Sequence, residues 1–528
     1  MFDIVIKNGY VIDGSKSPRF KADVAIQGEK IAAIGEIDLA RALRVIDAGN
    51  RVVAPGFIDM HSHGDFTLVG CPTADSLVHQ GVTTAVVGQC GFSLAPLLPK
   101  TRDEVASSLE TRKTSIPWDQ WSDFRSYLDF MRSLGVSINL VPLVGQGTVR
   151  AGVIGFVSDR PNSGEMAAMK AQVIKAMEGG AIGISTGLIY PPGSYASTEE
   201  LIELTRPVGE RKGFYFSHIR GEGETLIEAV EEAIRIGRET GASVEISHLK
   251  ASWPNNWPKQ AQAIDLIERA REEGLNINAD AYPYLAGSTS LKSALPEWAQ
   301  EGGKKAIQGR LSDPSTRRKM TEDMYREGLC RDGSWEKIVI SRSPKRPEYA
   351  GRAVSDLSAE AGKGPEDWVF DALLETDLDA GMILFMMLED NLRSVLKHPA
   401  VMIGSDSHIL PLEGPLATGT PHPRTFGTFV RVLGHYAREE KVLTLEEAVH
   451  KMTGLTADKL HLSDRGLVKK GFKADIVVFD PETIADCATY TDPFKYPTGV
   501  SHVLCNGKAV ISEGRHTGAR PGKIVRSG

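Results

Sequence analysis

The sequence predicts an α/β protein organised as a (β/α)8 TIM-like barrel with two additional parts. Through the middle of the chain, short apolar segments alternate with amphipathic helical segments, which is the pattern of βα units and a parallel sheet. Eight of the apolar segments have strand length, and eight such units favour a closed barrel. An open doubly wound sheet is the alternative fold, but no early strand is followed by Gly-x-Gly-x-x-Gly.

Both ends of the chain have the pattern of short β-strands. Near the amino end, apolar segments such as residues 3–7 and 10–13 are separated by turn signals, of which Asn8-Gly9 is the first. The same pattern returns near the carboxyl end, in residues 474–480, 500–507 and 508–512. Two β-rich ends around a different middle predict one small β-sandwich domain, formed by residues 1–55 and 465–528.

Residues 56–464 are predicted to form the catalytic barrel. Its eight expected strands lie at residues 53–61, 82–88, 138–144, 181–185, 214–218, 243–248, 275–280 and 401–406. Amphipathic helices are expected between them, at residues 164–179, 198–212, 222–240 and 259–273. The interval between strands seven and eight is too long for a simple connection, so about residues 285–380 are predicted to form an inserted subdomain that can overhang the site.

Composition limits the classes of function. The chain has 528 residues, of which 41% are hydrophobic and 24% charged, as in a soluble globular protein with more than one domain. A formal net charge of -7 gives no basic surface for nucleic acid and no polybasic membrane patch. No segment has the pattern of a signal peptide or a membrane span, so a cytoplasmic protein is expected. The five cysteines lack Cys-x-x-Cys spacing, which predicts free thiols or one metal ligand.

Side chains of metal-binding type stand at the carboxyl ends of the predicted strands. The first strand ends in His61 and His63, whose spacing puts both side chains on one face. The later strands end in Cys90, His218, His248 and Asp406. In a barrel of this type, the working residues come from these strand ends. Imidazole, thiolate and carboxylate are the groups that bind zinc, so the pattern indicates a metal site.

Each of these residues has an ordinary structural explanation when it is considered alone. A single free cysteine such as Cys90 is typically a small buried hydrophobic residue. A single buried histidine is more often hydrogen-bonded in the core than a ligand, and Asp406 alone could cap the next helix. Five strands that all end in such residues are hard to assign to chance, and together they favour the metal site.

The segments around these residues resemble a known family. Ala54-Pro-Gly-Phe-Ile-Asp-Met-His-Ser-His63 resembles the signature of the amidohydrolase superfamily. Val87-Gly-Gln-Cys90-Gly, His248-Leu-Lys250, Gly404-Ser-Asp406 and residues 423–429 look like the N-acyl-D-amino-acid deacylases, or D-aminoacylases, within it. The similarity continues to residues 517–522 and therefore covers essentially the whole chain.

The resemblance implies a role for each matching residue. Cys90, His218 and His248 would hold one tightly bound Zn2+, and His61 and His63 would hold a second, weaker ion, with Cys90 able to bridge the two. Asp406 would be the general base and acid. Tyr190, Lys250, Ser288 and Arg424 would surround the substrate. An arginine fork matches a carboxylate, and Lys250 shares a strand face with His248, so both cations fit a substrate carboxylate.

The expected function is a zinc-dependent amidohydrolase that deacylates N-acyl-D-amino acids by attack of metal-activated water. Its partner is a small-molecule substrate, and the products are a carboxylate and the free D-amino acid. The alternatives are hydrolysis of a cyclic or other amide at the same metal site, and a non-catalytic barrel scaffold. The handedness of the substrate follows from the resemblance alone.

Two positions depart from the family pattern, Gln89 and Gln146, and Gln146 leaves the acyl preference open. Side-chain preference, metal number and oligomeric state are also left open.

Overall fold

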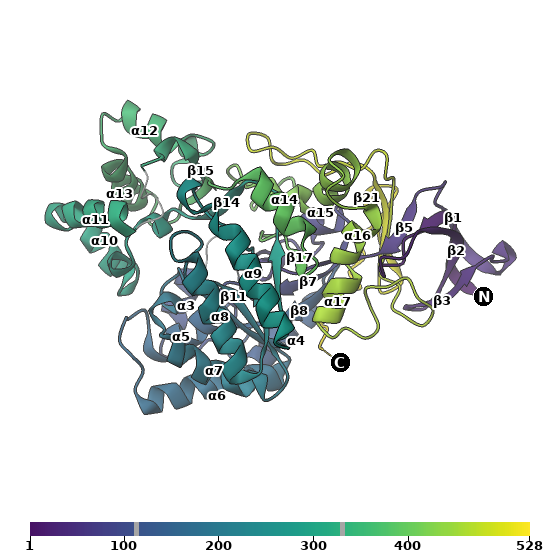
Figure 1. The fold of residues 1–528 in the computed structure, drawn as a ribbon, viewed down its shortest axis with the longest axis horizontal. Coiled ribbons are helices and arrows are strands. Elements are labelled where there is room, and N and C mark those ends of the chain that lie inside the picture. Colours follow the sequence, from purple (N-terminus) through teal and green to yellow (C-terminus); the bar gives the residue numbers. More distant parts are fainter. Residues whose placement is uncertain (110–115, 328–332, 528) are drawn as a thin grey trace.

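The structure, a computed structural model, describes residues 1–109, 116–327 and 333–527 (Figure 1). Its central strands are β6 (Phe57–Asp59), β7 (Val82–Val87), β8 (Asn139–Pro142), β9 (Val144–Gly145), β10 (Gly183–Gly187), β11 (Phe214–His218), β12 (Ser243–Ile246), β13 (Ile277–Ala281) and β17 (Val401–Ile403). Each of the eight predicted strands has a counterpart among them. The first predicted strand is interrupted after Pro55, because β5 (Val52–Pro55) pairs in a different sheet from β6, and the third is divided into β8 and β9. The α/β class with parallel sheets is therefore confirmed.

The central strands pair in two parallel sheets, β6-β7-β8 and β9-β10-β11-β12-β13-β17. Backbone hydrogen bonds also connect the outer strands of the two sheets. Met60 N donates to Ile403 O over 3.2 Å, and Asp406 N donates to His61 O over 2.8 Å. Since neighbouring strands run in the same direction, their carboxyl ends lie at one edge, where the predicted site residues follow them.

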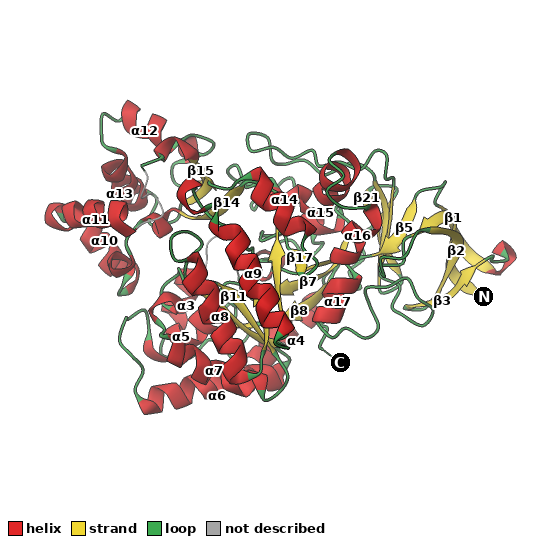
Figure 2. Cartoon of the chain, in the orientation of Figure 1, coloured by secondary structure: helices red, strands yellow, loops and turns green. Residues whose placement is uncertain are grey.

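Helices lie against these strands, as the sequence periodicity predicts (Figure 2). They include α4 (Phe124–Leu134), α5 (Gln146–Ile154), α6 (Ser163–Gly179), α7 (Thr198–Gly209), α8 (Leu226–Thr240), α9 (Lys259–Glu272), α14 (Glu389–Lys397), α15 (Arg424–Arg431), α16 (Leu445–Lys451) and α17 (Gly454–Lys459). In α8, apolar residues three and four positions apart form the buried face, and Gly241 ends the helix in the left-handed conformation. Asn162 and Glu165 form a capping box at the start of α6.

The two ends of the chain meet in one nine-stranded sheet. It contains β1 (Phe2–Val11), β2 (Phe20–Gln27), β3 (Lys30–Gly35), β4 (Ala42–Asp47), β5 (Val52–Pro55), β18 (Ile476–Phe479), β19 (Val500–Cys505), β20 (Lys508–Ser512) and β21 (Arg515–His516). The expected turn at Asn8-Gly9 is wrong, because β1 continues through it. Asn8 takes a positive φ of 59°, and the register shifts between Ile6 and Gly9, so this dipeptide forms a bulge within a single strand.

The long segment between β13 and β17 has its own sheet and its own core. Its elements are β14 (Ala286–Ser290), α10 (Gly303–Ser312), α11 (Pro314–Glu327), β15 (Ile338–Arg342), α12 (Val354–Glu360), α13 (Pro365–Glu375) and β16 (Gly381–Phe385). The strands pair in the order β14-β16-β15, and a separate cluster of buried apolar residues fills the space beneath the helices. Figure 1 shows these helices at the opposite end of the molecule from the nine-stranded sheet. The sequence predicted an inserted subdomain here but not its three strands.

Two further findings bear on the composition-based predictions. Among the described residues, no helix has both the length and the apolar character that crossing a membrane requires. Cys71, Cys90, Cys487 and Cys505 are free thiols, as predicted, while Cys330 lies outside the described residues.

One glycine contact can be tested for its effect on stability. A Cβ at Gly187, the last residue of β10, would overlap the carbonyl oxygen of Cys90, so Gly187→Ala must displace the backbone that carries this cysteine. We expect a loss of about 1–3 kcal/mol in the free energy of unfolding, measured by urea denaturation. Gly309 in α10 is exposed and has open space around its Cα, so Gly309→Ala should instead stabilise by about 0.5–1 kcal/mol. If the two substitutions changed the free energy of unfolding equally, the close contact between Gly187 and the carbonyl oxygen of Cys90 would be contradicted.

Candidate metal centre

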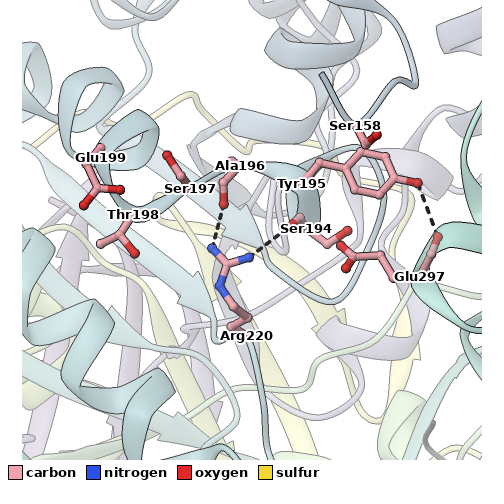
Figure 3. A pocket seen from close by; sticks show the side chains of 9 residues that line it. All are labelled: Ser158, Ser194, Tyr195, Ala196, Ser197, Thr198, Glu199, Arg220 and Glu297. Carbon is pink, nitrogen blue, oxygen red and sulfur yellow. Dashed lines mark hydrogen bonds between the residues drawn. The ribbon is translucent and has the colours of Figure 1, made fainter. Parts of the chain in front are cut away.

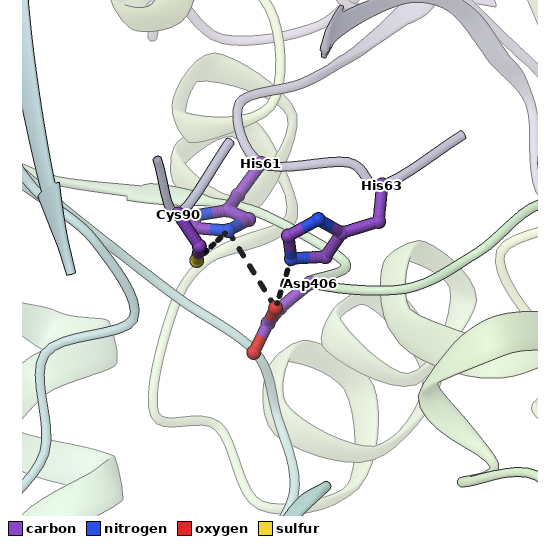
Figure 4. Close-up of side chains that lie close together, drawn as sticks. All are labelled: His61, His63, Cys90 and Asp406. Atoms are coloured by element: carbon purple, nitrogen blue, oxygen red, sulfur yellow. Dashed lines mark hydrogen bonds and ion pairs between the residues drawn. The ribbon is translucent and has the colours of Figure 1, made fainter. Parts of the chain in front are cut away.

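The strand ends bring the six predicted residues together in two groups that could hold a metal ion. Cys90, His218 and His248 form the first group. The second consists of His61, His63, Cys90 and Asp406 (Figure 4). Within each group, one ligand atom per residue lies within 4.8 Å of all the others. Cys90 belongs to both groups, so the two share its sulfur.

The distances from Cys90 Sγ show that the first group fits a zinc ion. Sγ lies 3.6 Å from His218 Nδ1 and 3.7 Å from His248 Nε2. Tetrahedral zinc with a Zn–S bond of about 2.3 Å and a Zn–N bond of about 2.05 Å separates these two atom types by about 3.6 Å. All three side chains are buried, and one thiol with two imidazoles is a normal zinc donor set.

The second group is arranged around the same sulfur and one carboxylate oxygen. His61 Nε2 lies 3.4 Å from Cys90 Sγ and 3.5 Å from Asp406 Oδ1. His63 Nε2 lies 3.2 Å from the same Oδ1. In Figure 4, both rings turn toward Asp406, and the sulfur lies beside His61. His61 and His63 thus face a common point, as their alternate spacing predicts.

Charge interactions keep the thiol and the carboxyl group in their ionised forms. Burial alone would raise the pKa of Cys90, but His61, His63, His218 and His248 lower it well below its ordinary value. Burial also opposes ionisation of Asp406, but Arg424 and His248 hold the pKa of that carboxyl well below its usual range. Since the thiolate is the form that binds metals, the group is electrostatically prepared for a cation.

The backbone at three of these positions is strained. Cys90, His248 and Asp406 have φ values of 52°, 38° and 47°, in a region that L-residues with a side chain seldom adopt. Each follows the end of a parallel strand, at the point where the chain turns away from the sheet. Such strain persists where the surrounding structure fixes the backbone, and it concentrates at functional sites.

Two residues that the sequence analysis did not select, Asp280 and Glu222, support the ligands, and a third, Tyr282, packs against the predicted substrate cations. Asp280 Oδ2 lies 3.4 Å from His61 Nδ1, and its Oδ1 accepts a hydrogen bond from His248 N over 2.9 Å. Glu222 Oε1 lies 2.9 Å from His248 Nδ1. Tyr282 is buried between Lys250 and Arg424. Asp280 stands at the end of predicted strand seven, so the strand-end rule could have found it, whereas Glu222 lies in a loop without a comparable signal.

The two predicted cations lie next to the metal groups and are both paired. Arg424 Nη1 is 2.9 Å from Asp406 Oδ2, and its Nη2 donates to Ser288 O over 3.3 Å. Lys250 Nζ is 2.5 Å from Glu222 Oε1. Both cations face the ring of Tyr282, with Arg424 Cζ 4.5 Å and Lys250 Nζ 5.7 Å from its centroid. The phenolic oxygen of Tyr282 is buried and has no hydrogen-bond partner among the described residues.

The other predicted substrate residues also reach this region. The ring of Tyr190 packs edge-on against His218 with centroids 5.0 Å apart, and its hydroxyl is 3.0 Å from Thr289 Oγ1. Ser288 lies on β14, where its carbonyl oxygen accepts the bond from Arg424. His422, close to the site in sequence, donates to Ala286 O and accepts from Arg424 N, so its ring connects β14 to the backbone of Arg424.

The two departures from the family pattern have different surroundings. Gln89 Nε2 donates to Met60 O over 3.0 Å and so connects the ends of β7 and β6. Gln146, at the start of α5, is fully buried, and neither its Oε1 nor its Nε2 has a hydrogen-bond partner among the described residues. Gln89 therefore has a structural role, while the structure gives no internal role to the amide of Gln146.

A further pocket, lined largely by residues that follow β10 and β11, contains none of the predicted site residues (Figure 3). Its lining residues are Ser158, Ser194, Tyr195, Ala196, Ser197, Thr198, Glu199, Arg220 and Glu297. The guanidinium of Arg220 donates to Ser194 O and Ala196 O and pairs with Glu232. Because the guanidinium of its one lining cation is engaged within the chain, the strand-end cluster remains the candidate site.

Comparison with known proteins agrees with this geometry. A model of the amidohydrolase family matches residues 44–133 and 350–511. A D-aminoacylase from Alcaligenes xylosoxydans xylosoxydans is 38% identical over 99% of this chain and 97% of its own. An N-acyl-D-glutamate deacylase from the same organism is 38% identical over 99% of this chain and 96% of its own.

Solved structures show the same relationship in three dimensions. A D-aminoacylase described as having a binuclear metal centre, with one-metal activation and second-metal attenuation, superposes with a TM-score of 0.84 at 37% identity, over all of both chains. An N-acyl-D-glutamate deacylase from Bordetella bronchiseptica, in complex with zinc and a phosphonate inhibitor, gives 0.82 at 34% identity over 99% of each chain. The chain therefore belongs to the D-aminoacylase family of amidohydrolases.

Proposed function

We propose that this protein is a zinc-dependent hydrolase that cleaves the amide bond of N-acyl-D-amino acids, releasing a carboxylate and the free D-amino acid. The observation that carries the proposal is the pair of ligand groups that share Cys90 Sγ, with Asp406 on one side and the cations Arg424 and Lys250 beyond it. Full-length similarity to a D-aminoacylase and an N-acyl-D-glutamate deacylase supports the reaction and the handedness.

We assign the tight zinc site to Cys90, His218 and His248. His61 and His63 would hold a second, weaker ion. Zinc supplies a Lewis acid that polarises the acyl oxygen and lowers the pKa of a water molecule to about 7. The chain supplies the thiolate, the buried imidazoles and the carboxylate that accept this ion in the spacing described above.

Asp406 is proposed as the general base and acid. Its Oδ1 faces His61 and His63, while Oδ2 is held by Arg424, so the carboxylate is fixed at the edge of the ligand groups. It would accept the proton of the attacking water and deliver it to the leaving nitrogen when the C–N bond breaks. Water oxygen then remains with the acyl carbon, and no covalent acyl-enzyme forms.

Arg424 and Lys250, with the Tyr282 hydroxyl, are proposed to bind the carboxylate of the substrate. Both cations face the ring of Tyr282, and the hydroxyl of this tyrosine is buried without a partner among the described residues. These three groups can all donate hydrogen bonds to a carboxylate. Tyr190 and Ser288 would line the same space. Hydantoin and dihydropyrimidine have no free carboxylate, and this arrangement therefore favours a linear N-acyl amino acid over opening of those rings.

The architecture around the site is proposed to be a closed (β/α)8 barrel over residues 56–464. Hydrogen bonds between Met60 and Ile403 and between His61 and Asp406 support closure between the first and last strands. Residues 1–55 and 465–528 would form the small β-sandwich domain, and residues 285–380 the inserted subdomain. β16 (Gly381–Phe385) completes the sheet of that segment and extends it slightly beyond the expected boundary.

The substrate class is tested with a matrix of N-acetyl-D- and N-acetyl-L-amino acids, with amine release as the readout. We expect the zinc-loaded enzyme to release amines from the D series, because the full-length relatives act on that series by name. Absence of amine release throughout would refute the proposed reaction. Release from the L series alone would keep the reaction and reject the handedness, and hydrolysis of hydantoin or dihydropyrimidine substrates would favour the cyclic-amide alternative.

The assignment of the two ligand groups is tested by metal content. Cys90 is common to both groups, so Cys90→Ser should remove zinc and activity together. His63 belongs only to the second group, and His63→Ala should retain at least one zinc per chain by elemental analysis. The opposite order of sensitivity would contradict the assignment.

The role of Asp406 is tested with Asp406→Asn, which preserves the shape of the side chain but cannot accept the water proton. We expect kcat to fall by about 10²–10⁴-fold while the zinc bound through Cys90, His218 and His248 remains. Asp390→Asn, at an exposed position of α14, is the control and should leave kcat unchanged. If Asp406→Asn retained most of its activity, another group would have to move the proton.

A further inference from the structure

We propose that Glu222 is a positioning residue that selects the metal-binding tautomer of His248 and at the same time fixes Lys250. Its Oε1 lies 2.9 Å from His248 Nδ1 and 2.5 Å from Lys250 Nζ. The inference deepens the proposed function, because it rests on the assignment of His248 to the tight zinc site.

Two side chains compete for the same ring nitrogen of His248. Lys250 Nζ is also 2.9 Å from His248 Nδ1, the same distance as Glu222 Oε1. The ammonium of lysine can only donate a hydrogen bond, whereas an ionised glutamate can only accept one. Nδ1 therefore carries a proton when it bonds to Glu222 and is bare when it bonds to Lys250.

The choice between these two bonds decides whether the opposite nitrogen can bind a metal. A neutral imidazole carries one proton, so a proton on Nδ1 leaves Nε2 bare. His248 Nε2 is the atom that faces Cys90 Sγ, at 3.7 Å. If Lys250 supplied the bond to Nδ1, the proton would lie on Nε2 and point into the ligand group. We expect Glu222 to prevent this, because its Oε1 lies 2.9 Å from Nδ1 and can accept the proton there.

The position of Glu222 is itself held by the chain. Its carbonyl oxygen accepts a hydrogen bond from Ser252 N over 2.7 Å, which connects the loop after β11 to the loop after β12. Its side chain is only 13% exposed, and Lys250, His218 and His248 lower the pKa of the carboxyl group against the effect of burial. An ionised acceptor is thus fixed beside His248, in the arrangement by which outer carboxylates orient metal-binding histidines.

The same carboxylate connects the metal ligand to the proposed substrate cation. Lys250 Nζ is 2.5 Å from Glu222 and 5.7 Å from the ring centroid of Tyr282. By drawing the ammonium toward itself, Glu222 offers it an acceptor other than His248. Glu222 thus keeps the lysine charge available on the substrate side and limits the donation to Nδ1 that would leave the imidazole proton on Nε2.

The test compares zinc affinity in four variants and the wild-type chain. The variants are Glu222→Gln, Lys250→Met, the double variant Glu222→Gln/Lys250→Met, and Glu232→Gln as a control. Zinc retention is measured against graded chelator, and the thiolate-to-cobalt absorption of the Co2+-loaded protein reports on the ligand group. Glu232 is the control, because its carboxylate is similarly buried but pairs with Arg220 and Thr198 rather than with a ligand histidine.

We expect Glu222→Gln to weaken zinc binding about 10–100-fold and to change the cobalt spectrum. Lys250→Met and Glu232→Gln should stay within about 3-fold of wild type, since neither removes the acceptor for Nδ1. The double variant should recover much of the lost zinc affinity, because the competing donor is absent. A role limited to folding does not predict this recovery. If Glu222→Gln fails to fold, the double variant and Glu222→Asp, which keeps the charge on a shorter side chain, are measured in its place.

Several outcomes would overturn the inference. They are an unchanged zinc affinity in Glu222→Gln, a double variant that binds no better than Glu222→Gln, or a loss in Lys250→Met as large as in Glu222→Gln. The readout does not depend on deacylation. If zinc affinity depends on Glu222 but the protein releases no amine, the proposed function is rejected and this inference stands. If the enzyme is active but Glu222→Gln leaves its zinc affinity unchanged, the proposed function stands and this inference is rejected.

Discussion

The shared position of Cys90 Sγ is the constraint on which the rest of the site depends. One sulfur must lie about 3.6 Å from two imidazoles and also face His61 and the carboxylate of Asp406. The carbonyl oxygen of Cys90, just after β7, lies against the end of β10. A side chain at position 187 would overlap that oxygen, so this position requires glycine. The positive φ of Cys90 then turns the thiol toward the other strand ends.

Buried charges at the site are arranged in pairs. Asp406 is held by Arg424, and Glu222 by Lys250, on two sides of Tyr282. An unpaired charge in this environment would be costly, so the pairs allow two carboxylates and two cations to remain ionised next to a metal-binding thiolate. The proposed substrate carboxylate would join these cations, which links substrate binding to the groups that act on the amide.

Much of the candidate site could be predicted because parallel strands place their carboxyl ends at one edge. His61, His63, Cys90, His218, His248 and Asp406 were all selected by that rule, and the structure brings them together. The rule does not reach Glu222, which lies four residues beyond His218 in a loop whose path depends on its bond to Ser252. The turn at Asn8-Gly9 was misread for a related reason. A left-handed asparagine suits a bulge as well as a hairpin, and pairing with β2 decides between them.

The sequence by itself determined the alternation of strands and helices, the residue types at the strand ends and, through its similarity to known proteins, the family. These depend on local periodicity and residue chemistry, which can be read along the chain. Only the tertiary structure decided which nitrogen of each histidine faces the sulfur, which carboxylate holds each cation and how the two ligand groups overlap. These features depend on distances between segments that lie far apart in the sequence, such as the 158 positions between Cys90 and His248, and no local pattern encodes them.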